Sequence, residues 1–109
     1  MFVNVRLDAS PVEVNLEEPG DCTRFHVAVS GGGAPQPARL DAALRDASVG
    51  RADGEDARIA VDAVRRMAAG RVGPGWERDL DAMLTYARDK GWLGDDGTIA
   101  AHVEWPTTG

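Results

Sequence analysis

The sequence predicts an α+β fold in which a small antiparallel sheet of four strands is packed against three helices. Apolar and polar residues alternate over residues 2–30 and again over 98–105, which is typical of half-buried strands. Between them, over residues 38–90, apolar residues recur with the spacing of amphipathic helices. The chain has 109 residues, the size of one ordinary domain, so we expect a single domain over residues 1–109.

Three strands are expected in the first part of the chain, over residues 3–7, 12–16 and 25–29. Tight turns separate them, which favours an antiparallel meander. The closing strand, over residues 98–105, is expected to join the same sheet, because neither the sheet nor the helices can bury their apolar sides alone.

Three helices are expected between the strands, over residues 38–47, 57–68 and 76–90. Asp53 is expected to cap the second helix. Gly91 is placed to end the third in a left-handed conformation, because glycine has no Cβ to clash there.

The charge and composition disfavour several classes of protein. The formal net charge is −6, from 18 acidic and 12 basic residues, which disfavours binding to nucleic acid or to an anionic membrane. Cys22 is the single cysteine, so no intrachain disulfide can form. Residues 2–7 are too short for the apolar core of a secretory leader, and no apolar run reaches the roughly 20 residues of a membrane span. We therefore expect a soluble, cytoplasmic protein.

Two segments carry a resemblance. Residues 69–76, and residues 91–93 through 101–105, are similar to short uncharacterised proteins of actinobacteria. The resemblance covers the C-terminal third of the chain. It implies a bacterial, cytoplasmic setting and no particular activity.

The outer face of the sheet is the first candidate site. Arg24 and His26 share one side of their strand, and His102 and Glu104 share one side of theirs. If the two strands pair, these four side chains converge, and such a group can bind a ligand or move protons near neutral pH. A solvated face of an antiparallel sheet has the same composition. Two histidines fall short of the three or four ligands of a zinc site, so no metal is predicted.

The turn before the third helix is the second candidate site. If Trp76 stays partly exposed beside Arg71, the pair would suit a partner-binding anchor, since both residue types are common at interface hot spots. The alternative interpretation is that Trp76, Trp92 and Trp105 all belong to the core or its edge, because each follows an apolar face.

Other motifs favour simple interpretations. Cys22 could be a reactive thiol only if its thiolate were stabilised, and an incidental small residue fits as well. The glycines at 31–33 lack the spacing of a phosphate-binding loop and fit a flexible link. Residues 95–97 read as a turn and do not have EF-hand spacing. A winged helix-turn-helix would use residues 76–90 for recognition, but that helix carries many carboxylates, which DNA repels.

The predicted function is a non-enzymatic protein-binding or regulatory module. Its partner would be another protein or a second copy of the chain, engaged through an edge strand of the sheet. No cofactor is predicted. The alternative is a small enzyme or a metal- or ligand-binding protein that uses the His/Glu/Arg group of the outer face.

Overall fold

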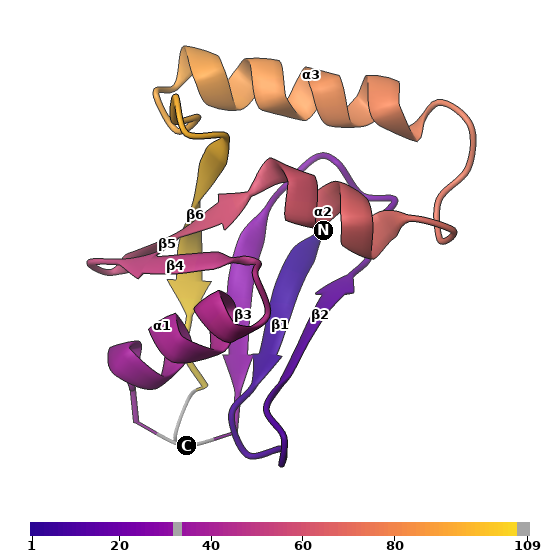
Figure 1. Cartoon of the computed structure of the whole chain (residues 1–109). Coiled ribbons are helices and arrows are strands. Elements are labelled where there is room, and N and C mark those ends of the chain that lie inside the picture. The colour runs from indigo at the N-terminus through magenta and orange to yellow at the C-terminus, as the bar shows by residue number, and fades with distance from the viewer. Residues whose placement is uncertain (32–33, 107–109) are drawn as a thin grey trace.

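Six strands form one mixed sheet in the computed structural model of the chain, which describes residues 1–31 and 34–106. The strands are β1 (Phe2–Arg6), β2 (Glu13–Glu17), β3 (His26–Ser30), β4 (Gly50–Asp53), β5 (Asp56–Ala60) and β6 (Thr98–Glu104). The helices are α1 (Pro37–Asp46), α2 (Val61–Ala68) and α3 (Trp76–Asp89). Across the sheet the order is β2-β1-β3-β6-β5-β4 (Figure 1). The α+β class is confirmed, whereas the expected four-stranded antiparallel sheet is wrong.

The first three strands are not a meander. β1 pairs antiparallel with β2, but β3 pairs with β1 in parallel, so β1 lies between the other two. Residues 18–25 therefore cross over the end of β1. The amino group of Met1 donates hydrogen bonds to the carbonyl oxygens of Asp21 (2.9 Å) and Arg24 (3.3 Å) in that crossing segment. These contacts between distant residues hold the segment in place, and local turn signals do not encode them.

The helix predicted over residues 57–68 is helical only from Val61 onward. Its first part is β5, which pairs antiparallel with β6, and α2 begins at Val61. Ala57 and Ile59 are fully buried and alternate with the more exposed Asp56 and Arg58. Strand pairing and burial in the sheet decide the conformation here, because β preference depends on the tertiary surroundings.

Residues 50–54, between the first two predicted helices, contain the first strand of a hairpin. Asp53 ends β4 instead of capping a helix, and Gly54 turns the chain with a φ of +60°. The loop consists of Gly54 and Glu55, and glycine at the first of two loop positions suits a tight hairpin turn.

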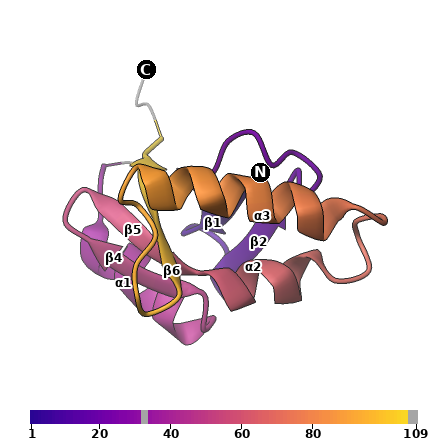
Figure 2. The ribbon, with the colours of Figure 1, turned by 90° about the horizontal axis from the view of Figure 1, so that it is seen from above.

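The helices close the core from one face and one end of the sheet. Figures 1 and 2 show α1 and α2 on the same face, while α3 lies across the end of the strands. Leu40 and Leu44 of α1, Val64 of α2 and Leu80 of α3 are buried, together with Val3 of β1. The helical residues among them lie on the apolar faces that the sequence predicted for the helices.

The third helix ends as predicted. Gly91 has a φ of +79°, and the amide of Trp92 donates a hydrogen bond of 2.8 Å to the carbonyl oxygen of Ala87. This is the hydrogen bonding of a left-handed glycine cap. Trp92 is thereby directed from the end of α3 toward the start of β6.

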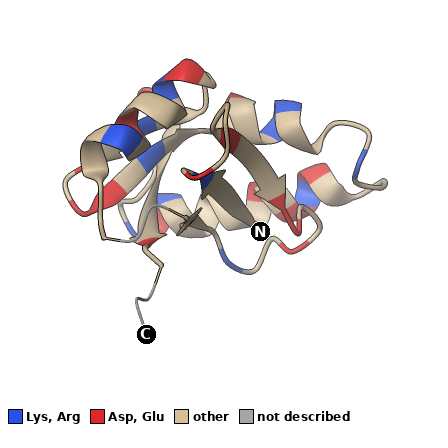
Figure 3. Ribbon diagram, turned by 90° about the horizontal axis from the view of Figure 1, so that it is seen from below, with Lys and Arg blue, Asp and Glu red and all other residues tan. Residues whose placement is uncertain are grey.

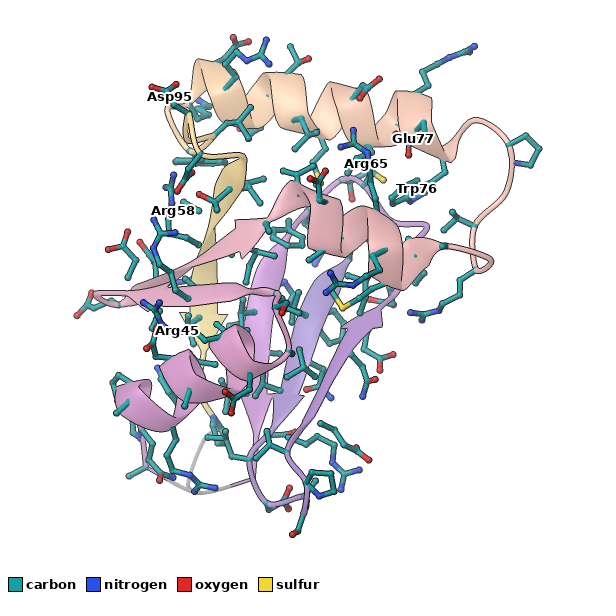
Figure 4. All side chains as sticks on the ribbon, viewed as in Figure 1. Arg45, Arg58, Arg65, Trp76, Glu77 and Asp95 are labelled. Atoms are coloured by element: carbon teal, nitrogen blue, oxygen red, sulfur yellow. The ribbon has the colours of Figure 1, made fainter. Side chains whose placement is uncertain are left out.

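An ionic cluster links α2 and α3 at the surface. Arg65 Nε lies 3.3 Å from Glu77 Oε2, and its terminal nitrogens lie 3.8 Å from Asp62 and from Asp81. Figure 4 shows Arg65 and Glu77 where the two helices face each other, beside Trp76. Because these groups are exposed, the cluster adds little stability, of the order of 1 kcal/mol or less per pair.

One expectation lies in part outside the described residues. Gly32 and Gly33 of the glycine-rich link are not among the residues described, and neither are residues 107–109. Within residues 1–31 and 34–106, no helix combines the length and the apolar character needed to cross a bilayer.

Candidate functional site

One face of the sheet is buried under helices and the other is open. Val3, Val27 and Val103 point into the core, and the residues next to them along each strand point to the opposite side. In the described part of the chain, no helix lies over that side (Figure 2). We call it the open face; its main residues are Phe2, Asn4, His26, Ala28, Asp56, Ala100, His102 and Glu104.

A single row of residues crosses all six strands on the open face. Strand register pairs Phe2 with His26, His26 with His102, and His102 with Asp56. The same register extends the row to a carboxylate at each end, which gives the order Glu17, Phe2, His26, His102, Asp56 and Asp53. The row therefore places the chain's two histidines side by side, with acidic residues flanking them.

Each histidine of the row has a carboxylate nearby. His26 Nε2 lies 3.6 Å from Glu104 Oε2, and the His26 ring stacks on Phe2 with centroids 5.0 Å apart. His102 Nδ1 lies 3.9 Å from Asp56 Oδ1. Both distances exceed a hydrogen bond, so these are loose charge contacts on an accessible surface. Within the described residues, no group of three His, Cys, Asp or Glu side chains is placed to hold a metal ion.

Three of the four residues predicted for this site come together. β3 and β6 pair, and this brings His26, His102 and Glu104 into one group. Arg24 lies in the crossing segment before β3 and is exposed. Within residues 1–31 and 34–106, its guanidinium makes no hydrogen bond to either histidine. A binding role for the group stays a prediction.

The second predicted site is structural. Trp76 is only 7% exposed, and its indole Nε1 donates a hydrogen bond of 2.6 Å to the carbonyl oxygen of Pro19. Arg71 Nη1 donates one of 2.7 Å to the carbonyl oxygen of Leu16. Both side chains tie the α2–α3 region to β2 and the segment after it. The interpretation of Trp76 as a core residue is therefore confirmed, and the condition for the alternative, an exposed anchor at this turn, is not met, because tertiary packing uses both polar ends internally.

The two outer strands are partly blocked, which bears on the expected edge pairing. On β2, Arg71 already occupies the Leu16 carbonyl oxygen. On β4, the backbone amide of Ala52 donates a hydrogen bond of 3.0 Å to Asp41 Oδ1 of α1. Side chains that use edge groups in this way hinder strand addition by another chain.

Two exposed aromatic residues border the open face, and the sequence did not predict them. Tyr86 is 57% exposed and Trp92 is 46% exposed, and their rings meet edge to face with centroids 5.8 Å apart. Trp92 is not among the residues that pack against the core, so the expectation that it belongs to the core or its edge is wrong, whereas Trp105 does pack against the core. Tyr86 lies off the apolar stripe of α3, which was the signal available for its exposure.

A hollow joins these aromatic residues to the histidine row. It has a volume of about 260 Å³. It is lined by Phe25, Asp56, Trp92, Ala100, Ala101 and His102. We call it the Trp92 hollow. It therefore combines aromatic side chains, the small side chain of Ala100 and one carboxylate.

Cys22 does not have the character of an activated thiol. It is partly buried, and this burial, followed by the negative charge of Asp79, raises the pKa of its thiol. A reactive cysteine needs a lowered pKa. The interpretation as a small, partly buried residue of the crossing segment is favoured.

Comparisons with protein-family models, curated proteins and solved structures found no match for this chain. The open face and the Trp92 hollow are therefore the basis for a functional proposal.

Proposed function

We propose that the chain is a non-enzymatic protein-binding or regulatory module whose binding surface is the open face beside Trp92. One observation carries this proposal. Tyr86 and Trp92 are two of the three large apolar side chains exposed in the described residues; their rings are in contact, and Trp92 lines a hollow. Clustered exposed aromatic residues are typical of protein interfaces.

The energy available at this surface is sufficient for a hot spot. Trp92 is 46% exposed, so covering it would remove on the order of 100 Å² of largely apolar surface from water. At about 25 cal/mol per Å², this contributes roughly 2–3 kcal/mol before the costs of association. Such a value matches the hot-spot residues of measured interfaces.

The face is a better binding surface than the edges of the sheet. Asp41 and Arg71 already occupy backbone groups of β4 and β2. The open face carries side chains that remain accessible, with His102 72% exposed and Asp56 56% exposed. Binding through side chains on this face requires no rearrangement of the sheet.

The test is capture of a partner with matched variants. The purified protein is immobilised at moderate salt and exposed to a lysate of the organism that carries the gene, and retained proteins are identified by mass spectrometry. We expect one stoichiometric partner on the wild type and on Val12→Ala, which alters an exposed apolar residue elsewhere. Trp92→Ala is expected to weaken retention by roughly 30-fold or more, as for a hot spot. Retention of nothing by the folded wild type, or equal retention by Trp92→Ala, would contradict the proposal.

A small enzyme or a ligand-binding protein is the second candidate. The observation in its favour is that His26 and His102 are neighbours in register and that each lies within 4 Å of a carboxylate. NMR titration of both histidine rings distinguishes the candidates. Coupled titration that changes on addition of a small molecule or Zn²⁺ would favour a ligand site, whereas independent titration would weigh against it.

A further inference from the structure

The chemistry of the Trp92 hollow identifies the kind of side chain that it receives. We propose that it binds an arginine side chain of the partner protein, an inference that rests on the proposed function. An arginine guanidinium can stack on an aromatic face and donate hydrogen bonds to a carboxylate at the same time. The hollow offers both groups, through Trp92 and Asp56.

A backbone hydrogen bond to β6 fixes the position of Trp92 in the hollow. The amide of Ala100 in β6 donates a hydrogen bond of 2.8 Å to the carbonyl oxygen of Trp92, so Trp92 lies beside that strand. Tyr86 meets the Trp92 ring edge to face and supports it from the side of α3. On the open face Ala100 carries only a methyl group, which leaves space between the indole and the histidine row, whereas the Ala101 side chain points into the core. This space is slightly below the usual range for small-molecule sites, and it suits one side chain.

The carboxylate of the hollow remains available for a hydrogen bond. Asp56 is 56% exposed, and its contact with His102, at 3.9 Å, is too long to be a hydrogen bond. The nearby cation Arg58 points elsewhere: its Nε donates a hydrogen bond of 3.1 Å to Thr98 Oγ1, and its guanidinium packs against Gly94. Figure 4 shows Arg58 on the β4–β5 side of the molecule. Among the described residues, no guanidinium is therefore paired with Asp56.

The net charge of the chain, and not the cation nearest the hollow, favours a basic partner. Lys90 Nζ lies 5.5 Å from the centroid of the Tyr86 ring, so a cation of this chain already occupies that ring and repels a second cation beside it. Figure 3 shows acidic and basic residues interspersed over the elements, while the chain as a whole carries a net charge of −6. A negative protein attracts a basic partner over a longer range than the contacts themselves.

The direct test uses a probe and its neutral analogue. N-acetyl-arginine amide is titrated into ¹⁵N-labelled protein, and the indole signal of Trp92, assigned with Trp92→Phe, is followed by NMR. N-acetyl-citrulline amide has the same shape without the charge and is the control. We expect saturable shifts at Trp92 and Ala100 with the arginine probe at millimolar concentration, and none that saturate with citrulline. Equal shifts with both probes, or no saturation with arginine, would overturn the assignment.

Two carboxylate variants test the role of Asp56. Asp56→Asn is expected to weaken binding of the arginine probe about two- to fivefold, the range for an exposed charge pair. Asp46→Asn removes a charge of the same type from α1, beside a separate groove lined by Val12 and Arg39, and is expected to leave the affinity unchanged. An unchanged affinity of Asp56→Asn would overturn the arginine assignment.

The outcomes separate this inference from the proposed function. A captured partner that is lost with Trp92→Ala but binds Asp56→Asn with unchanged affinity would overturn the arginine assignment and leave the protein-binding function intact. A wild type that captures no partner would overturn the protein-binding function itself.

Discussion

Replacing Trp76 with alanine is expected to destabilise the fold far more than the same change at Trp92. Trp76 is 7% exposed, so nearly all of its side chain is withdrawn from water, and its indole N–H is bonded to the carbonyl oxygen of Pro19. Truncating a buried tryptophan costs about 3–5 kcal/mol, which includes the cavity left behind. Trp92 is 46% exposed and leaves no closed cavity, so Trp92→Ala is expected to cost about 1 kcal/mol or less.

Urea unfolding followed by circular dichroism measures both changes. For an m-value of about 2 kcal/mol per molar urea, the Trp76 variant should lose roughly 2 M in its unfolding midpoint and the Trp92 variant about 0.5 M or less. Partner capture should show the opposite order among the variants that remain folded. Equal destabilisation at the two positions, or a Trp76→Ala cost below about 1 kcal/mol, would refute the assignment of Trp76 to the core and Trp92 to the surface.

Two further predictions concern the hairpin and the loop before β6. A Cβ at Gly50 would run into the carbonyl oxygen of Arg58, so Gly50→Ala is expected to cost about 1–3 kcal/mol. Gly20→Ala is the control, because the added methyl group would meet open space, and it should be nearly neutral when both variants are compared by urea unfolding. Equal destabilisation by the two substitutions would contradict the close approach of the β5 backbone to Gly50. Hydrogen bonding from the Thr98 side chain is the main cause that lowers the pKa of the Asp96 carboxyl, and desolvation, the next cause in size, opposes it. Because this folded-state pKa lies below the unfolded value, Asp96 stabilises the protein above the unfolded pKa, and this contribution is lost as pH falls through the folded pKa. Thr98→Val should therefore raise the pKa of Asp96 in a ¹³C NMR titration, and the variant should lose less stability than the wild type as the pH falls. An unchanged pKa would show that groups other than Thr98 set it.

Local patterns were enough to locate most of the elements. The alternation around Val3 and Val27 identified two strands, and the apolar stripe through Leu80 identified α3 with its end at Gly91. These predictions hold because burial of one side imposes a period on each element, whatever its neighbours. β5 was missed because Ala57–Ala60 is short and fits both periods, and pairing with β6 decided between them.

The candidate site depended on contacts that no local pattern contains. The sequence showed two histidines with nearby polar residues, but their meeting required β3 and β6, separated by most of the chain, to pair in parallel. The Trp92 hollow likewise required the end of α3 to lie beside β6. The chain's periodicity and charge set its strands, helices and acidic character. Strand order, register and the exposure of Trp92 and Trp76 came from tertiary packing, because the free energy of burial depends on which distant surfaces meet.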